Sequence, residues 1–585
     1  MTSETEQTGE RIDATDRIDA RDQPWASRPW AMAALCALSG LGFWAITEHI
    51  VEEPLSSWRP AAASGLAVAT IIFTFAVELR RWHWAAAFAV LWGVVTAFVV
   101  WNTGGYNVGG SFAEWPFFSV LLAATVAAPL FQTKRDVADS WTFWRLWQLP
   151  YRQLHLHAWT DAVLGAAAML FVGITFALAW MISSLFMLID IDFVRELLQK
   201  DWFGWMLAGA AFGGAIGLLR ERDKLVGTMQ RLVMIILSVL APVLAVALVL
   251  FLVSSIGTGF AKLWESGFSA TALMLAVAAA AVLFANAVIG NGDEDRSPNR
   301  VLHWSAAILA VTVLPLAIIA AVAMQLRIAD YGWTPERIWG VIAVVIALGY
   351  GLSGLWSLVR GRAGFDAVLR PLQQKLAITL GALALFLALP IVDFGAISAQ
   401  NQLARLRSGA IAADKFDWQA MAFDFGPAGR RALRDLARTG SAGQRTSATA
   451  ALAQTERHWE YETVDPDVDH RPLAVRLRVI PTNRPLPPAA MTALGSQYQC
   501  AQGACVAAWI DERRIAFAGQ SRANEGVISA ILYHNSNGDW ATYDENNRPD
   551  RHMSSADLST ATVELRSVTA HRLFVDGKPQ GELVE

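Results

Sequence analysis

Long apolar stretches alternate with short polar connections between Pro29 and Ala396, whereas the chain is polar before and after this region. A helix needs about 20 mainly apolar residues to cross a membrane, because its backbone polar groups must be satisfied within the helix itself. The segment Ile189–Leu198 mixes apolar and charged residues, so we expect it to lie at the membrane interface rather than to cross the membrane. The apolar stretches predict about eleven membrane-spanning helices, near residues 29–47, 60–78, 82–101, 113–132, 158–183, 202–219, 232–256, 268–289, 303–325, 338–358 and 376–396.

Lys and Arg are distributed unevenly between the polar connections. The N-terminal tail and every second connection hold 20 of them together, whereas the other connections hold six. Lys and Arg are retained on the cytoplasmic side during insertion, so this alternation predicts a cytoplasmic N-terminus. With an odd number of spans the C-terminal region then lies outside the cytoplasm, and one span more or fewer would reverse that side.

The composition fits a membrane protein. Hydrophobic residues make up 54% of the chain and charged residues 17%, against about 25% charged residues in typical soluble domains. Many of the 25 Trp residues stand at the ends of apolar stretches, as in the aromatic belts of membrane proteins. The net charge of −4 is small and implies no nucleic-acid partner. Residues 1–28 are polar and have no signal-peptide core, so we expect a disordered cytoplasmic tail (1–28), a transmembrane domain (29–396) and an extracytoplasmic domain (397–585).

Several residues within the spans have expected roles in packing. Gly209, Gly213 and Gly217 are spaced by four, which allows two helices to approach closely. Pro315 and Pro390 are expected to interrupt the ninth and eleventh helices, and the Gly-rich run 349–354 is expected to loosen the tenth. We interpret these as simple kinks rather than as a binding site.

Charged residues are absent from the centres of the predicted spans, which disfavours a proton-coupled transporter. Three carboxylates stand at span ends. They are Glu78, Asp161 and Asp393, and we interpret them as interfacial or capping groups. Asp161 and Asp393 remain candidate functional carboxylates at the membrane ends.

The region after residue 400 resembles a soluble domain in its pattern. Val475, Leu477 and Val479 alternate with Arg residues, which is the period of a half-buried strand. Asn537-Gly538 and Asp576-Gly577 predict tight turns. We predict a small α+β domain with a mostly antiparallel sheet, with helices within 417–438 and 446–457 and strands near 475–479, 504–510, 515–518, 527–533, 540–543, 561–568 and 572–575.

The chain has three Cys residues, of which Cys36 lies in the first predicted span. Cys500 and Cys505 flank a short turn in the predicted outer domain. In an oxidising compartment two Cys this close together favour a disulfide, and we predict one. Reduced thiols or a metal site are the alternatives, but the second ligand pair of a typical zinc site is missing.

Motifs with recognisable chemistry are scarce. Asp465, Asp467 and Asp469 lack the glycine and the distal Glu of a calcium loop, and we interpret them as a solvated loop. His155 and His157 precede a span and are interpreted as interfacial rather than metal-binding. The acidic residues 293–295 read as a solvated loop. We find no phosphate loop, zinc-protease motif or nucleophile elbow, so no catalytic residue, metal or cofactor is predicted.

The connection Leu326–Trp339 carries an Arg, then Tyr331-Gly332, then Thr334 and Arg337. With Ala158–Ala162 and Asn401–Asp435, it resembles the bacterial polytopic membrane family catalogued as domain of unknown function 4153. Asp161 departs from the family, where Asn is expected. The resemblance covers roughly residues 130–435 and implies a multi-pass bacterial membrane protein. Together with the orientation predicted above, we expect an inner-membrane protein with a periplasmic C-terminal domain. The family has no established activity, so the resemblance implies architecture and not chemistry.

The same connection has a physical interpretation. Thr334, followed by Pro335 and Glu336, is a good helix start, with Thr as the N-cap. Arg327 and Arg337 lie on the Arg-poor side, where they would pair with acids of the C-terminal domain, bind an anionic ligand or headgroup, or simply anchor the helix ends. Arg327, Tyr331 and Arg337 are therefore the candidate functional positions of the outer face.

Three functions remain open at this point. The first is a non-enzymatic envelope protein that senses or binds a partner through its periplasmic domain. The second is a transporter or flippase of a lipid-linked or apolar substrate, indicated by the many spans and the Pro residues within them. The third is a membrane-embedded envelope enzyme that uses outer-face residues. The expected partners are the lipid bilayer and either an envelope protein or a lipid headgroup.

Overall fold

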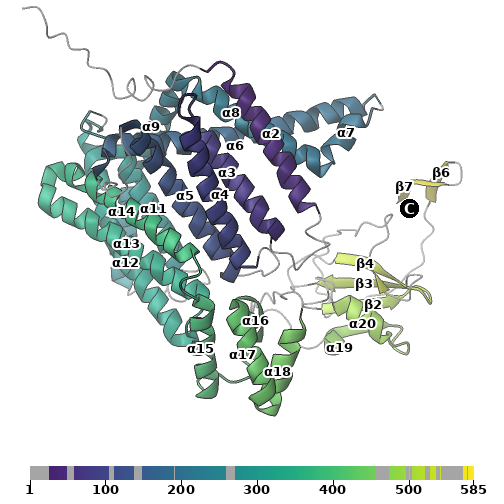
Figure 1. The fold of residues 1–585 in the computed structure, drawn as a ribbon. Coiled ribbons are helices and arrows are strands. Elements are labelled where there is room, and N and C mark those ends of the chain that lie inside the picture. The colour runs from purple at the N-terminus through teal and green to yellow at the C-terminus, as the bar shows by residue number, and fades with distance from the viewer. Residues whose placement is uncertain are drawn as a thin grey trace, which may run out of the picture. The chain divides into compact units, whose positions relative to one another are not determined.

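The computed structural model describes residues 25–48, 58–104, 111–137, 148–189, 191–258, 270–294, 296–454, 473–495, 500, 504–520, 528–534, 540–541, 571–575 and 578–584 (Figure 1). The chain divides into two compact units, Met1–Arg457 and His458–Glu585. Several sequence predictions fall outside the described residues: most of the N-terminal tail, the Asp465–His470 loop, the two Gly turns and the strand at 561–568.

The first unit is built from long helices that correspond to the predicted spans. Two short elements lie between them, α7 (Phe193–Leu198) and the 3-10 turn η3 (Arg362–Gly364). The long helices are α2 (Arg28–Thr47), α3 (Trp58–Ala76), α4 (Trp82–Asn102), α5 (Ser111–Val137), α6 (Tyr151–Met187), α8 (Asp201–Arg220), α9 (Asp223–Thr258), α11 (Ala270–Ile289), α12 (Arg300–Tyr331), α13 (Pro335–Gly361) and α14 (Phe365–Ala388).

Ten stretches of the described chain are long and apolar enough to cross a membrane. The tenth, Pro335–Ala388, contains both α13 and α14 with the turn η3 between them. Large apolar side chains such as Leu170, Val243 and Val253 are exposed along α6 and α9, which suits surfaces that face lipid. The chain is therefore a multi-pass membrane protein.

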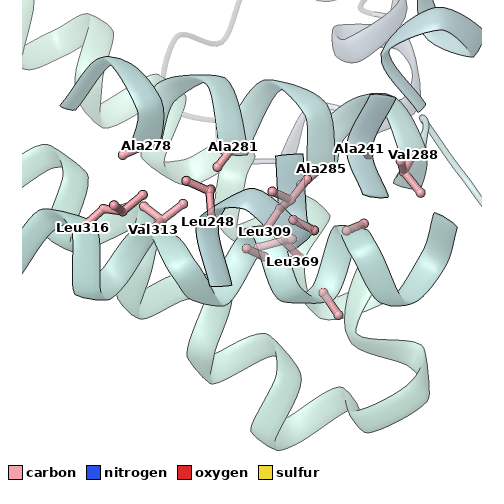
Figure 2. Close-up of a cluster of buried hydrophobic side chains, with 14 of the residues drawn as sticks. Ala241, Leu248, Ala278, Ala281, Ala285, Val288, Leu309, Val313, Leu316 and Leu369 are labelled. Atoms are coloured by element: carbon pink, nitrogen blue, oxygen red, sulfur yellow. The ribbon is translucent and has the colours of Figure 1, made fainter. Parts of the chain in front are cut away.

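Small residues allow the helices of the bundle to pack closely. Figure 2 shows Ala278, Ala281 and Ala285 of α11 facing Leu309 and Val313 of α12. All five side chains are buried, and residues of α9, α13 and α14 complete the same core. Without a hydrophobic force between helices in lipid, such close van der Waals packing is a main source of association.

The predicted close approach at the glycines of α8 is confirmed, and the partner is α2. A Cβ added to Gly213 would lie 2.8 Å from the Cβ of Cys36, and one on Gly217 would lie 2.7 Å from the Cα of Pro29. The expectation for the 349–354 run is wrong, since α13 continues through it. Gly351 packs there against α12, where an added Cβ would lie 2.6 Å from the Cα of Leu314.

The end of the last long helix differs from the prediction. α14 begins at Phe365 and ends at Ala388, whereas the predicted span covered 376–396. Pro390 therefore follows the helix rather than interrupting it, because Pro cannot continue the hydrogen-bonded ladder. Pro315 does lie within a continuous α12.

Four shorter helices close the first unit: α15 (Phe394–Arg407), α16 (Trp418–Phe423), α17 (Gly426–Thr439) and α18 (Ala442–Ala453). Their core contains Phe416, Met421, Leu433 and Leu436. The two helices predicted after residue 417 are confirmed, as α17 and α18. These helices belong to the same compact unit as the membrane helices, because the division of the chain falls at Arg457.

The second unit contains a five-stranded sheet in the order β1 to β5. The helix α20 (Pro488–Gly495) connects β1 to β2, and these two strands are the one parallel pair among the described strands. All other described pairs are antiparallel, so the sheet is mostly antiparallel, as predicted. Val475 belongs to a short helix, α19 (Leu473–Arg476), rather than to the strand. The strands are β1 (Leu477–Ile480), β2 (Ala504–Trp509), β3 (Arg514–Gln520), β4 (Ile528–His534), β5 (Trp540–Ala541), and the separate hairpin β6 (His571–Val575) and β7 (Lys578–Val584).

Candidate functional site

The turn between α12 and α13 contains the outer-face candidates. Thr334 is the N-cap of α13, as predicted, and its hydroxyl accepts a hydrogen bond from the backbone N–H of Arg337. The guanidinium of Arg337 donates to the carbonyls of Tyr331, at 3.2 Å, and Gly332, at 2.7 Å. It also lies 5.4 Å from the centre of the Tyr331 ring. Arg337 thus satisfies carbonyls that the end of α12 leaves without helical partners.

Helix α15 holds this turn from the other side. The Gln402 amide donates to the carbonyls of Tyr331, at 2.9 Å, and Trp333, at 3.0 Å. The side-chain oxygen of Asn401 accepts from the backbone N–H of Trp333, at 3.0 Å. Arg405 donates to the carbonyls at residues 329 and 330. Sequence reasoning missed the contacts of these three side chains, because nothing in the spacing of α15 indicates which turn it meets.

The backbone conformation at residue 332 and the space around it explain why this turn contains a glycine. The φ angle of Gly332 is +76°, a conformation that side chains rarely adopt. An added Cβ would also lie 2.7 Å from the Asn401 side-chain oxygen and 2.8 Å from the Gln402 amide nitrogen. Tyr331 is 63% exposed and Arg327 is exposed, so the structure brings the three candidate residues to one helix end without burying them.

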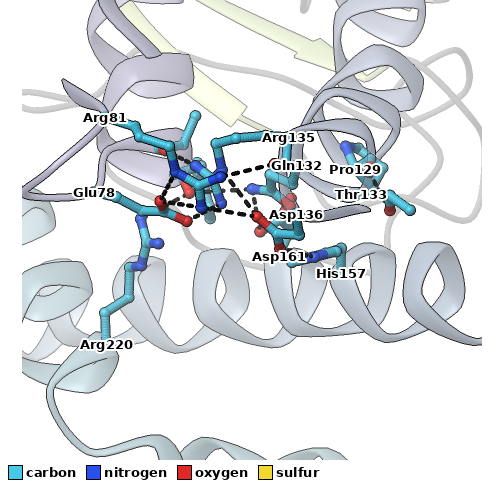
Figure 3. Close-up of polar contacts among 12 residues, drawn as sticks. Glu78, Arg81, Pro129, Gln132, Thr133, Arg135, Asp136, His157, Asp161 and Arg220 are labelled. Atoms are coloured by element: carbon cyan, nitrogen blue, oxygen red, sulfur yellow. Dashed lines mark hydrogen bonds and ion pairs between the residues drawn. The ribbon is translucent and has the colours of Figure 1, made fainter. Parts of the chain in front are cut away.

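A second group of charged residues lies buried where several long helices end or begin (Figure 3). The carboxylate of Glu78, which follows α3, pairs with Arg135 of α5 and with Arg81, the latter at 2.7 Å. Asp136 pairs with Arg135 at 3.1 Å and with His157 of α6 at 3.0 Å. The side chains of Glu78 and Arg135 are each only 5% exposed. Glu78 is therefore a buried member of an ion-pair cluster, a role that its interpretation as an interfacial or capping carboxylate did not include.

Side chains of neighbouring helices bind the carbonyls at the end of α3. Arg220 of α8 donates to the carbonyl of Phe75 at 2.8 Å, and Gln132 of α5 donates to the same oxygen at 3.1 Å. Arg135 donates to the carbonyl of Ala76. Cations and amide donors at this end complement the helix dipole and satisfy its last carbonyls. In the sequence, the Lys and Arg residues of these connections predicted an orientation in the membrane. The contacts of Arg side chains with buried helix ends were not predicted.

A related cluster joins the end of α11, the loop that follows it and α14. Arg370 pairs with Asp366 one turn earlier, at 2.8 Å, and donates to the carbonyl of Ile289, the last residue of α11, at 2.9 Å. It also reaches Asp293 at 3.1 Å, so this residue of the predicted solvated loop makes a contact with the bundle. Arg296 pairs with Asp366 at 3.4 Å. Arg side chains again bind one helix end to its neighbours.

Asp161 is less completely satisfied than the other carboxylates. Its Oδ1 accepts from the Gln132 amide at 3.2 Å. Its Oδ2 and the Oε1 of Gln132 are buried, and neither has a hydrogen-bond partner within the described part of the chain. Unsatisfied buried oxygens in a membrane protein call for a functional or solvent-mediated explanation.

The other sequence candidates of the bundle have simpler roles. Asp393 is the N-cap of α15, and its Oδ1 accepts from the backbone N–H of Ala396 at 2.8 Å. His157 belongs to the ion-pair cluster. His155 is buried between Tyr151 and Trp159, with ring centres 5.5 and 6.2 Å away. Among the described residues, no group of three or more His, Cys, Asp or Glu side chains is arranged to hold a metal ion.

In the second unit, Cys500 and Cys505 form a disulfide, as predicted, with a Cα–Cα distance of 5.2 Å. Both residues are buried in the core beside Leu494 and Leu532. This core position fits a structural crosslink that fixes the start of β2.

A shallow cleft of about 570 Å³ lies beside the β2–β3 turn, lined by Asp511, Glu512, Arg513, Arg514, Tyr533 and His534. The backbone N–H of Arg513 and the side chain of Arg514 lower the pKa of Asp511 below its usual 3.8. Asp511 accepts from these groups at 2.8 and 2.7 Å, so it is ionised at neutral pH and fixes the turn.

Comparison with known proteins bears on the family but not on the activity. No curated protein matches the chain, and no solved structure matches it either. The model of a family described as a domain of unknown function (DUF4153) matches residues 61–434, which include the bundle from α3 onward, the α12–α13 turn and α15. The chain therefore belongs to the family of membrane proteins that carry the domain of unknown function DUF4153.

Proposed function

We propose that this protein is a non-enzymatic inner-membrane protein of the bacterial envelope, and that its C-terminal region senses or binds a partner outside the cytoplasm. In this proposal eleven helices cross the membrane, the N-terminus is cytoplasmic and residues 397–585 are periplasmic. The bundle is a rigid support, and the recognition surface lies in the region that follows it.

Contacts at both ends of α13 and α14 support counting them as two crossings. Phe394, just beyond α14, packs against Trp339 in the first turns of α13, with ring centres 5.2 Å apart. At the opposite end, an added Cβ on Gly361 of α13 would lie 3.3 Å from Val368 of α14. The two helices therefore run antiparallel over their whole length. If α13 crosses the membrane, α14 crosses it back.

The observation that carries the proposal is how the bundle uses its buried charges. Arg135 pairs with both Glu78 and Asp136, and Arg135, Arg220 and Arg370 also bind the carbonyls of helix ends. Breaking such contacts would leave charges unpaired in a medium of low dielectric, so the arrangement opposes helix movement. A bundle held in this way suits a support more than a moving transporter.

Complementation with a truncated chain tests the proposal. A strain without the gene is screened for an envelope defect, and the full chain or residues 1–457 alone are then restored at matched membrane levels. We expect the truncated chain to reach the membrane and to leave the defect in place. Full rescue by residues 1–457 would show that the function resides in the first unit and would overturn the proposal.

The buried oxygens of Asp161 and Gln132 favour transport as the second candidate. A buried carboxylate inside a membrane domain, with one oxygen that accepts no hydrogen bond, is a common feature of ion and proton pathways. Proteoliposomes that contain the full chain are assayed for dissipation of a pH gradient and for movement of labelled lipids. Movement that is lost in Asp161→Asn would favour transport. We expect no movement beyond that in protein-free vesicles.

A further inference from the structure

The turn between α12 and α13 must lie at a membrane surface. Both helices belong to stretches that are long and apolar enough to cross a membrane, and only three residues, 332–334, separate them. Aromatic rings surround the turn, as they do at the headgroup level of membrane proteins. Trp339 stacks on Trp115 of α5, with ring centres 5.7 Å apart. This position holds whichever side of the membrane the turn occupies.

Three guanidinium groups are associated with this helix end. Arg327 lies one turn before Tyr331, Arg337 lies in the first turn of α13, and Arg405 reaches the same end from α15, which Figure 1 shows below α12 and α13. Arg337 donates both of its hydrogen bonds to the turn from a single atom, Nη1. A guanidinium has five N–H donors, so most of the donors of Arg337 are not used by the carbonyls of α12.

Within the described part of the chain, nearby carboxylates offset the charge of these three residues only in part. None of Arg327, Arg337 and Arg405 forms an ion pair with a carboxylate of the described chain, in contrast to the buried Arg residues of the clusters. Asp330 and Glu336 stand in the same stretch, so three cations face two carboxylates. The excess positive charge lies at the level where lipid phosphates are found.

We propose that Arg327, Arg337 and Arg405 form a binding site for a phosphate group, carried by the headgroup of an anionic phospholipid. Arg binds phosphate through two parallel N–H donors, and such charge-assisted contacts are among the stronger hydrogen bonds in proteins. Arg337 and Arg405 are already oriented by the carbonyls of α12. Arg327, which is exposed, completes the site from the last turn of α12.

Lipid binding to the purified full chain tests this site. The protein is exchanged into phosphatidylcholine nanodiscs with or without phosphatidylglycerol, and retained lipid is counted by native mass spectrometry. Arg327→Ala is the test variant, because Arg327 is exposed and forms no hydrogen bond or ion pair within the described residues. Arg434→Ala is the matched control, an exposed Arg on α17 that lies outside the turn. Inorganic phosphate is added as a competitor.

We expect selective retention of phosphatidylglycerol by the wild-type chain, about tenfold weaker in Arg327→Ala and unchanged in Arg434→Ala. Competition by inorganic phosphate at low concentration would support the same site with a soluble phosphate as its ligand. Absence of competition would assign the lipid. Equal retention in the wild type and in Arg327→Ala, or an equal loss in both variants, would overturn the proposal.

Discussion

Arg135 and Glu78 form an ion pair between α5 and the end of α3, with both side chains about 95% buried, since each is 5% exposed. Arg81 and Asp136 extend this pair into a network that joins four helices. Such a network stabilises the bundle only while every member keeps its partner, because the desolvation of each charge is offset by the others.

The substitution Glu78→Gln removes the negative charge between Arg81 and Arg135. We expect a loss of about 3 kcal/mol in stability, because two guanidiniums then remain close together without that carboxylate. The measurement is unfolding of the purified protein in mixed micelles. Asp435→Asn is the control, since its pair with Arg438 is 64–75% exposed and should contribute under about 1 kcal/mol. Equal effects of the two substitutions would contradict a structural role for the buried pair.

Gly332→Ala should destabilise the α12–α13 turn more than Gly409→Ala destabilises the end of α15. Both glycines have positive φ angles, +76° and +75°, so both substitutions carry the same backbone strain of about 1 kcal/mol. Only the Cβ at residue 332 would meet other atoms, whereas nothing lies within 4 Å of one at Gly409. The difference between the two unfolding midpoints reports the contact with α15. Identical midpoints would show that α15 does not hold the turn.

Substitutions of Asp393 distinguish a role as a helix cap from a functional role of its negative charge. As the N-cap of α15 it should be replaceable by Asn, which caps a helix equally well, whereas Ala should cost about 1 kcal/mol. Thermal unfolding and complementation are measured for both variants. Loss of function in a stable Asp393→Asn protein would instead assign a role to the negative charge.

The β2–β3 turn should depend on pH through Asp511. Because its folded pKa is lowered, its contribution to stability is complete above the unfolded value near 3.8 and disappears as the pH falls through the lower folded pKa. Asp511→Asn should therefore weaken the turn at neutral pH and make little difference in strong acid. Hydrogen exchange of the β3 amides measures this. A difference between the two proteins that does not change with pH would contradict it.

The sequence predicted the helices well because crossing a membrane constrains composition and length so strongly. Each predicted span corresponds to a long helix, and the α8 glycines meet α2 as expected. The end of α14 was misplaced because Ile391 and Val392 continue the apolar pattern beyond Pro390. Hydropathy does not register that the helix has ended. The interpretation of Asp393 as a capping group is confirmed, because it caps the next helix, α15.

Only those contacts of the candidate site that join residues close together in the sequence were predicted. Thr334, Pro335 and Arg337 follow capping rules that act over a few residues, and the structure has the helix start where those rules place it. The contacts of Gln402 and Arg405 with the same turn join residues about 70 positions apart, and no local rule predicts them. The cluster around Glu78 was missed because its Arg partners resembled ordinary cytoplasmic charges.

Thiol labelling tests the central claim, that eleven helices put the second unit outside the cytoplasm. Intact cells are treated with a membrane-impermeant maleimide, with and without prior reduction, and the shift in mass is read on a gel. Cys36 lies within α2, a helix long and apolar enough to cross the membrane, where the impermeant reagent does not reach it, so it should remain unlabelled. We predict labelling of Cys500 and Cys505 only after reduction, and before the cells are lysed. Labelling that requires lysis would place the second unit in the cytoplasm and contradict the eleven-span topology.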